Sequence, residues 1–286
     1  MAETTVGIGP AAFRIVSAWP KGIAELDRLY AGYPRPAIAD FTVRLAPAGP
    51  LRRWLRPSVA IRGDHMLPGA APLPGSQHLL AAEMGMNLQM ALGWRHHLLL
   101  HASAVERDGA VLLMCGDSGS GKSTLAALLA GRGWRLFGDE FALVDPANGL
   151  AHPFPRLVSL KGRAIDAVAA AGGEARFGPL LSDTPKGAIR HLVPDPAHVA
   201  RMAEAAPPAL ILFPRFGGAP GLRRVGRAEL AMRLTQASTN YVALGAAGHE
   251  ALVRLIELPA VAIDYDRGEA GLDLVERLWA ERGADR

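Results

Sequence analysis

One stretch of nine residues, 116–124, constrains this chain more than any other, and it reads Gly-Asp-Ser-Gly-Ser-Gly-Lys-Ser-Thr. It fits the phosphate-binding loop pattern G-x-x-x-x-G-K-[ST]. In such a loop the backbone N–H groups converge on phosphate oxygens, which requires residues that tolerate unusual dihedral angles and carry no obstructing side chain. The three glycines meet that requirement, so the stretch predicts a binding site for the phosphates of a nucleotide.

The neighbouring residues have the order that such a loop requires. Residues 110–115 form a short apolar run typical of a buried strand, and Leu125, Leu128 and Leu129 follow the loop at helical spacing. The alternative is a glycine-rich turn before a helix. Strand, loop and helix together favour the nucleotide site.

The cofactors that this loop predicts are ATP and Mg²⁺. Lys122 would reach the outer phosphates, the Ser123 hydroxyl would ligate Mg²⁺, and the positive end of the helix would face the anion. We expect the nucleotide to contact every position of the loop: Gly116, Asp117, Ser118, Gly119, Ser120, Gly121, Lys122, Ser123 and Thr124.

Composition narrows the class of protein. The chain has 286 residues, half of them apolar, so it can bury a substantial core. Its 31 basic and 27 acidic residues leave a net charge of +4, which is too small to indicate a nucleic-acid partner. Cys115 is the single cysteine, no run approaches the about 18 apolar residues of a membrane span, and no secretory start is seen. We expect a cytoplasmic protein that does not associate with a membrane.

Two domains are expected. Residues 1–75 read as a β-rich segment, with alternating strands at 41–45 and 58–62, and the prolines at 68, 72 and 74 suggest a linker. Residues 76–286 then form the nucleotide-binding domain, beginning with a helix at 79–92.

The rest of the chain predicts an α/β fold. Asp108-Gly109 indicates a hairpin whose second strand leads into the loop. Residues 134–144 read as a second hairpin or a bent strand. Other expected strands are 157–161, 209–213 and 261–265, and other expected helices are 165–171, 228–237, 249–258 and 269–282.

Chemistry beyond phosphate binding is suggested by the pair Asp139-Glu140, sixteen positions after Ser123 (139 − 123) at the end of an expected strand. A carboxylate there suits either Mg²⁺ binding or alignment of a nucleophile. The alternative is a solvated surface turn. His101 precedes the hairpin and is expected to hydrogen-bond a phosphate or orient a carboxylate, unless it is a satisfied core histidine. Charge on a transferred phosphoryl group also needs cations, for which the candidates are Lys161, Lys186, Arg190 and Arg215.

Together these residues resemble a known family. His101-Ala-Ser, the loop Gly-Asp-Ser-Gly-Ser-Gly-Lys-Ser and Arg135-Leu-Phe-Gly-Asp-Glu are similar to the catalytic core of HPr kinase/phosphorylase. The chain more closely resembles the HprK-related kinase A group, whose pattern also includes Glu83-Met-Gly-Met-Asn and Leu212-Phe-Pro-Arg. The strong resemblance covers about residues 80–165.

The resemblance implies a serine kinase whose nucleotide core is similar to that of phosphoenolpyruvate carboxykinase. Lys122 and Ser123 would hold phosphate and Mg²⁺, one of Asp139 and Glu140 would be the general base, and His101 would lie beside them. Position favours Asp139 as the base and leaves Glu140 for the metal. Relatives that modify peptide precursors imply a serine of a peptide or small protein as the acceptor.

The chain also departs from the prototype. Glu140 replaces an aspartate, and we find neither the Glu-Ile-Arg-Gly-Leu-Gly stretch that holds a further metal carboxylate nor the N-terminal domain. Phosphorylase activity and recognition of HPr are therefore not implied. Two rival functions stay open, namely a nucleotide hydrolase that works as a conformational switch and a scaffold that senses ATP without turnover. A homo-oligomer is possible with each.

Overall fold

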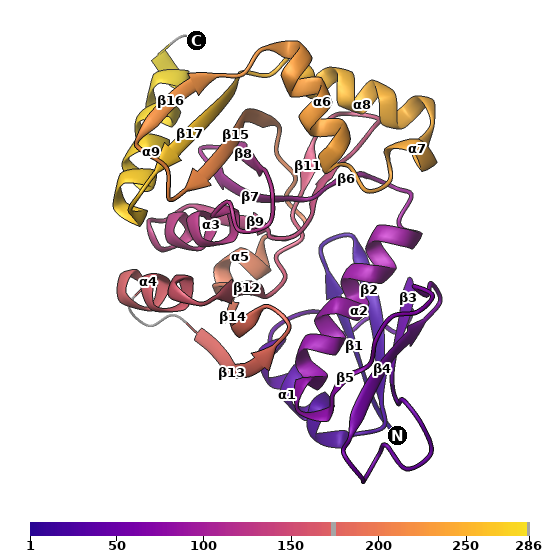
Figure 1. Ribbon diagram of the computed structural model, residues 1–286. Coiled ribbons are helices and arrows are strands. Elements are labelled where there is room, and N and C mark those ends of the chain that lie inside the picture. Colours follow the sequence, from indigo (N-terminus) through magenta and orange to yellow (C-terminus); the bar gives the residue numbers. More distant parts are fainter. Residues whose placement is uncertain (173–175, 285–286) are drawn as a thin grey trace. The chain divides into compact units, whose positions relative to one another are not determined.

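The computed structural model describes residues 1–172 and 176–284, and the fold is mixed α/β with several sheets. Contacts between backbone positions divide the chain into two compact units. The N-terminal unit comprises Met1–Arg95 with Leu181–Pro185, and the C-terminal unit comprises His96–Leu180 with Lys186–Arg286. The sheets of each unit are visible in Figure 1.

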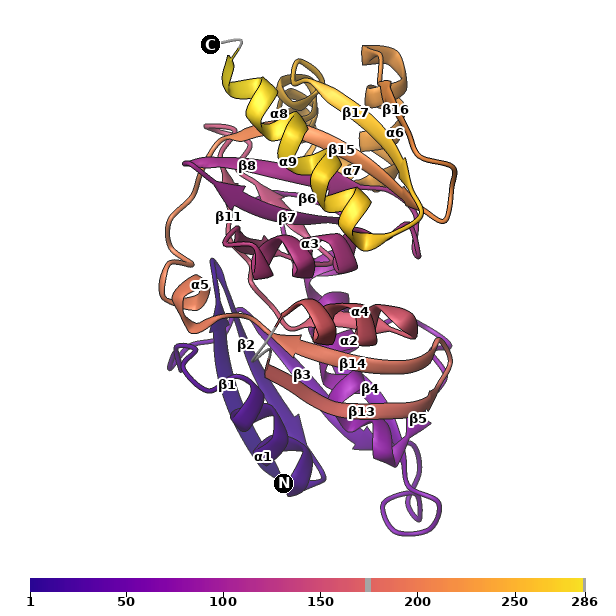
Figure 2. The same ribbon diagram turned by 90° about the vertical axis from the view of Figure 1, so that its left-hand side faces the viewer.

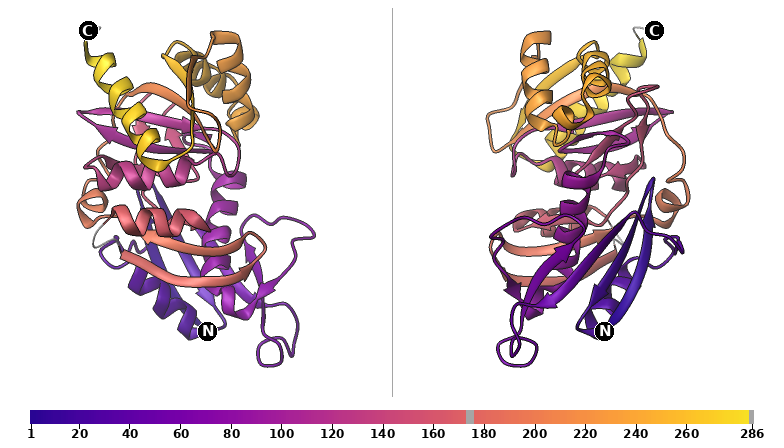
Figure 3. Two further views of the ribbon diagram at one scale, coloured as in Figure 1. Left: turned by 60° about the vertical axis from the view of Figure 1, so that its left-hand side comes forward. Right: turned by 90° about the vertical axis from the view of Figure 1, so that its right-hand side faces the viewer.

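The N-terminal unit is a five-stranded sheet with two helices packed on it (Figure 3). The strand order is β1-β2-β3-β4-β5, and only β2 and β3 pair in parallel. The Tyr30 hydroxyl joins the two helices by donating to Glu83 Oε1 at 2.7 Å. The elements are β1 (Ala2–Ile8), β2 (Ala11–Ser17), α1 (Pro20–Leu29), β3 (Phe41–Pro47), β4 (Ser58–Gly63), β5 (Leu73–Pro74), a 3₁₀ turn (Gly75–Gln77) and α2 (His78–Gly93).

The unit therefore extends beyond the expected boundary at residue 75. The expected helix at 79–92 is confirmed as α2, but α2 packs on β3 and β4 and so belongs to the N-terminal unit. Of the prolines that suggested a linker, Pro68 and Pro72 precede β5 and Pro74 is its last residue. Apolar side chains on α2, among them Leu79, Met86 and Met90, are fully buried, which explains why the division falls after the helix.

The C-terminal unit is organised by a six-stranded sheet in the order β16-β17-β15-β8-β7-β9. Strands β8, β15 and β17 run parallel, and the others pair antiparallel. The strands are β7 (Ala102–Arg107), β8 (Ala110–Cys115), β9 (Arg135–Gly138), β15 (Pro208–Phe216), β16 (Gly221–Arg224) and β17 (Ala260–Tyr265).

Both faces of this sheet are covered. One apolar core lies between the sheet and α3 (Lys122–Gly131) and α9 (Gly268–Ala284), the face seen in Figure 2, and continues to α4 (Arg163–Ala171), which packs on α3 and β12 (Val158–Lys161). The opposite core includes α6 (Arg227–Ala237) and α8 (Ala246–Ile256). The remaining elements are β6 (Leu98–Leu100), β10 (Ala142–Val144), β11 (Ala151–His152), β13 (Arg176–Thr184), β14 (Gly187–Val193), α5 (Pro196–Ala200) and α7 (Tyr241–Leu244).

Most expected elements of this unit are confirmed, including the hairpin at Asp108-Gly109, which joins β7 to β8. Residues 134–144 are a bent segment and not a second hairpin, because β9 pairs with β7 whereas β10 pairs with β6 and β11 in a three-stranded sheet. The β-hairpin of β13 and β14 was not expected. In the parts of the chain that are described, no helix has the length and apolar character of a membrane span.

Candidate functional site

The phosphate-loop motif lies at the carboxyl ends of three parallel strands. β8 ends at Cys115, directly before the motif, and β15 and β17 end beside it at Phe216 and Tyr265. The backbone N–H of Phe216 donates to Ser120 O at 3.1 Å, which ties the end of β15 to the loop. Ligands of open α/β sheets bind outside the carboxyl ends of parallel strands, so the loop occupies the edge where such a site is expected.

Gly121 is a position of the loop that favours glycine for two separate reasons. Its φ is 99°, which L side chains rarely adopt, and it caps the N-terminus of α3. A Cβ at this position would lie 2.4 Å from the Tyr265 hydroxyl oxygen. The sequence requirement for glycine here thus has two physical causes, the backbone conformation and the closeness of a neighbouring strand.

Lys122 is buried in the first turn of α3 and its ammonium group points back at the loop. Nζ donates to Gly116 O at 2.6 Å and to Asp117 O at 3.0 Å. Burial lowers the pKa of Lys122, an effect that the nearby carboxylates, led by Asp139, oppose. The lysine is therefore held within the loop, where a bound phosphate would compete with the carbonyl oxygens for its protons.

Asp139 is fully buried beside the start of α3. Its Oδ1 accepts a hydrogen bond of 2.5 Å from the Ser103 hydroxyl, and the Ser123 hydroxyl also interacts with the carboxylate. Among the described residues Oδ2 has no hydrogen-bond partner. Burial, and after it the charge of Glu140, raise the pKa of Asp139 in spite of these hydroxyls and Lys122. A buried carboxylate oxygen without a partner is costly, and such atoms occur where a ligand, an ion or a proton is accepted.

Glu140 has a strained backbone at the bend between β9 and β10. Its φ of 72° is rare for a residue with a long side chain. Oε2 lies 3.8 Å from His101 Nδ1, and both side chains are partly exposed. Burial and the charge of Lys122 lower the pKa of His101, so a neutral imidazole is favoured near pH 7. The bend thus turns Asp139 and Glu140 toward different surroundings, one buried and one open.

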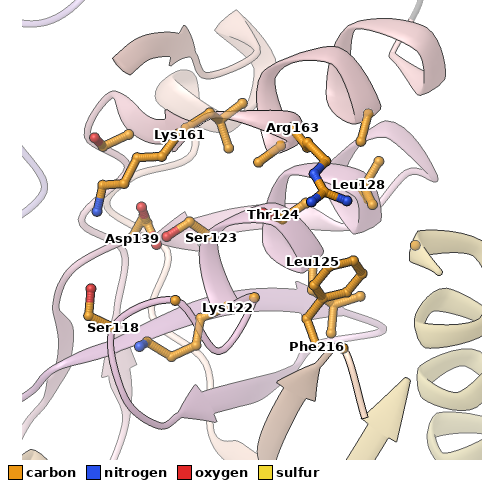
Figure 4. Close-up of a pocket in the computed structure, with 18 of the residues that line it drawn as sticks. Ser118, Lys122, Ser123, Thr124, Leu125, Leu128, Asp139, Lys161, Arg163 and Phe216 are labelled. Carbon is orange, nitrogen blue, oxygen red and sulfur yellow. The ribbon is translucent and has the colours of Figure 1, made fainter. Parts of the chain in front are cut away.

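A cavity of about 820 Å³ joins these groups (Figure 4). His101, Asp139 and Glu140 line it together with most of the loop, so the structure brings these three predicted catalytic residues to the fourth, Lys122, at the predicted phosphate site. In Figure 4 Asp139 lies beside the Ser123 hydroxyl, and the Lys122 side chain lies below them. The predicted loop residues that line it are Ser118, Gly119, Gly121, Lys122, Ser123 and Thr124, whereas Gly116, Asp117 and Ser120 do not line it.

The four candidate cations separate into two pairs. Lys161, at the end of β12, and Lys186 line the cavity. The Arg190 guanidinium instead donates to Gly178 O and lies over the Phe177 ring, and Arg215 pairs with Asp264 at an exposed position. Of the four candidates, the two lysines therefore lie at the cavity and the two arginines do not.

Several residues of the site were not predicted from the sequence. Ser103 belongs to the His101-Ala-Ser segment of the family resemblance, but that resemblance predicts no role for it. Its spacing of two from His101 is the signal that both belong to one side of an extended segment. Phe216 and Tyr265 could be predicted as site residues only if the parallel pairing of β15 with β17 were known, and hydrophobic periodicity does not reveal that pairing. The other unpredicted residues of the cavity wall that bear on its chemistry are Ser159, Arg163 and Arg267.

The donors present fit Mg²⁺ better than a metal held by protein alone. No group of three or more His, Cys, Asp or Glu side chains within residues 1–172 and 176–284 is arranged to hold a metal ion. Mg²⁺ is usually bound through one or two carboxylates, water and the phosphates of the substrate. The Ser123 hydroxyl, the unpartnered Asp139 Oδ2 and the open carboxylate of Glu140 are donors of that kind.

Comparisons with protein-family models and with curated proteins found no match to this chain. The assignment of a function therefore depends on the motif, the residues around it and their geometry.

Proposed function

We propose that the C-terminal unit is an ATP-dependent kinase of the HPr kinase type, with a nucleotide core similar to that of phosphoenolpyruvate carboxykinase. It would transfer the γ-phosphoryl group of ATP to a hydroxyl, a serine of a peptide or small protein. The observation that carries the proposal is the buried Asp139 carboxylate with its unpartnered Oδ2, next to Ser123 at the end of a phosphate loop. A carboxylate at this place can accept the proton of an acceptor hydroxyl or bind Mg²⁺, and phosphoryl transfer to a hydroxyl uses both.

The proton of the acceptor hydroxyl would go to Asp139. Oδ1 already accepts from Ser103, which leaves Oδ2 as the atom that receives the proton while the hydroxyl oxygen bonds to the γ-phosphorus and the bond to the bridging oxygen of ADP breaks. A raised pKa suits this role because a general base works best when its pKa lies near the working pH.

The other residues would hold charge. Lys122 would exchange its bonds to the loop carbonyls for bonds to the outer phosphates, and Lys161 and Lys186 would face the transferred group. Ser123 and Glu140 would hold Mg²⁺, which when bound neutralises charge on the phosphates. His101 would position Glu140 through the 3.8 Å contact.

The test is transfer from γ-labelled ATP with Mg²⁺ into an extract of cellular peptides and small proteins. The wild type is compared with Lys122→Ala and Asp139→Asn, and Lys21→Ala, which changes a lysine of α1, is the control. A labelled acceptor that the wild type and the control produce, and that both site variants fail to produce, supports the kinase.

The rivals give different results in the same assay. Labelled phosphate that is released equally with and without extract, and no labelled acceptor, indicates a nucleotide hydrolase. Neither product, in spite of ATP binding, indicates a sensing scaffold. Either outcome contradicts the proposal.

A further inference from the structure

Beyond the phosphate loop, the cavity continues into a region with a different lining. Its wall there consists of apolar side chains from α3 and α4 and of one aromatic ring, and we call it the apolar end: Leu125, Leu128, Ala164, Ala167 and Phe216. An α-helix rises 1.5 Å per residue, so Leu128 lies about 9 Å along α3 from Lys122. The Leu128 side of the apolar end is thus displaced from the loop, whereas Phe216 adjoins the loop at Ser120 and Gly121.

We propose that the apolar end is the site for the base of the nucleotide, which is held by its faces between Phe216 and Arg163. The inference rests on the proposed function, because it assumes that the loop binds the phosphates of a nucleotide. It goes further by assigning the residues that bind the base and by stating how selective they are.

Phe216 is placed to offer an aromatic face. It is 51% exposed although it lines a cavity, which is unusual for a phenylalanine. Its backbone N–H is bonded to Ser120 O, and its ring packs edge-on against Tyr265 with centroids 5.6 Å apart. The ring is therefore fixed relative to the loop from two sides, so it is preorganised for stacking.

Arg163 supplies the second planar group. It is the first residue of α4, and Figure 4 shows its guanidinium at the same end of the cavity as Leu128 and Phe216. No hydrogen bond or ion pair with a described residue engages it. A guanidinium stacks on aromatic rings and retains its in-plane donors, so a base is a suitable partner for it.

Few side chains at the apolar end can form selective hydrogen bonds with the edge of the base. Among the described residues that line the apolar end, none carries a carboxylate or a carboxamide, and the charged groups nearby, Arg163 and Arg267, only donate. These arginines offer no acceptor for the exocyclic amino group of adenine, so they do not favour ATP over GTP. We expect ATP and GTP to bind with affinities within about fivefold of each other.

Calorimetric titration with three Mg²⁺-bound probes tests the inference: ATP, GTP and inorganic tripolyphosphate, which has no base. Phe216→Ala should weaken ATP and GTP about tenfold, in line with the loss of one stacking face, and change tripolyphosphate less than twofold. Phe216→Leu keeps the apolar volume and removes the planar face, so its effect should be intermediate. Trp54→Ala removes an exposed aromatic side chain of the N-terminal unit and should change none of the three.

The outcomes separate the two proposals. A wild type that binds none of the probes contradicts nucleotide binding itself, and with it the proposed function. A wild type that binds ATP while Phe216→Ala leaves the affinity unchanged overturns only the base site. Discrimination between ATP and GTP above about a hundredfold overturns the claim that the base is held by its faces.

Discussion

Strand β9 begins at Arg135, whose guanidinium is buried against Glu106, and is followed directly by Asp139, whose carboxylate is buried beside the phosphate loop. Arg135 Nε donates to Glu106 Oε2 at 2.6 Å, and its other nitrogens donate to the carbonyl oxygens of Arg201 and Glu204. Asp139 has a hydroxyl partner on one oxygen and none among described residues on the other.

The buried charges at the two ends of β9 thus differ in how completely they are paired. At the Arg135 end the groups satisfy each other, and the cavity does not reach them. At the Asp139 end a like charge, Glu140, follows directly, and the shared cavity is open to a ligand. Complete pairing is what stability requires, whereas an incomplete set of partners is what binding and proton transfer require.

The largest effect on stability is expected when the buried ion pair of Arg135 with Glu106 is broken. Arg135→Ala leaves Glu106 buried without its cation, so the free energy of unfolding should fall by about 3–5 kcal/mol. Urea unfolding measures the change. The double variant Arg135→Met with Glu106→Leu removes both charges and should recover part of the loss. If the free energy of unfolding of Arg135→Ala falls by less than about 1 kcal/mol, the ion pair of Arg135 with Glu106 does not stabilise the fold as expected.

At the other end, Lys122→Ala should weaken binding of Mg²⁺-ATP about a hundredfold or more, because it removes a buried ammonium group that would bond to phosphate. Titration calorimetry gives the affinity. Lys21→Ala removes a lysine outside the cavity and is the matched control. An affinity that changes less than threefold in Lys122→Ala would contradict the role of the loop.

A smaller effect is expected from Gly121→Ala. The substitution strains a backbone with a φ of 99° and brings a Cβ against the Tyr265 hydroxyl, so ATP affinity should fall about tenfold. Adding Tyr265→Phe removes the clash but not the strain, and should restore part of the affinity. Gly131→Ala, in the last turn of the same helix, meets no atom within 4 Å and should leave binding unchanged.

The smallest effect is a pH dependence. Because the pKa of Asp139 is raised in the folded state, its ionisation disfavours folding. The wild type should therefore lose stability relative to Asp139→Asn as the pH rises from about 4, the ordinary pKa of an aspartate, through the folded pKa. Unfolding in urea between pH 4 and pH 8 measures the difference. If the stability of the wild type instead rises relative to that of the variant with increasing pH, the folded protein stabilises the ionised carboxylate, and the expectation is contradicted.

The fold and the site were predictable to different extents. The loop, β8 and α3 follow from local spacing, and the expected strand before Asp139 is β9. Pairing between distant strands has no comparable local signal. The parallel order of β8, β15 and β17, which brings Phe216 and Tyr265 to the loop, and the attachment of α2 to the N-terminal sheet depend on tertiary packing.

Among the candidate cations, position at a strand end or in a loop did not distinguish Lys161 from Arg215. The difference is that Arg215 has a carboxylate partner, Asp264, on the neighbouring strand, and this becomes apparent only from the pairing register. The roles of Asp139 and Glu140 depend likewise on burial, which the left-handed bend at Glu140 decides.

The role proposed for Asp139 is phosphoryl transfer and not stability. The most direct measurement is the rate of transfer from γ-labelled ATP in Asp139→Asn, together with its free energy of unfolding and its ATP affinity at pH 7. We predict a rate about 10²–10⁴-fold lower, retained ATP binding, and a stability equal to or above that of the wild type. A variant that transfers phosphate at the wild-type rate would contradict this role.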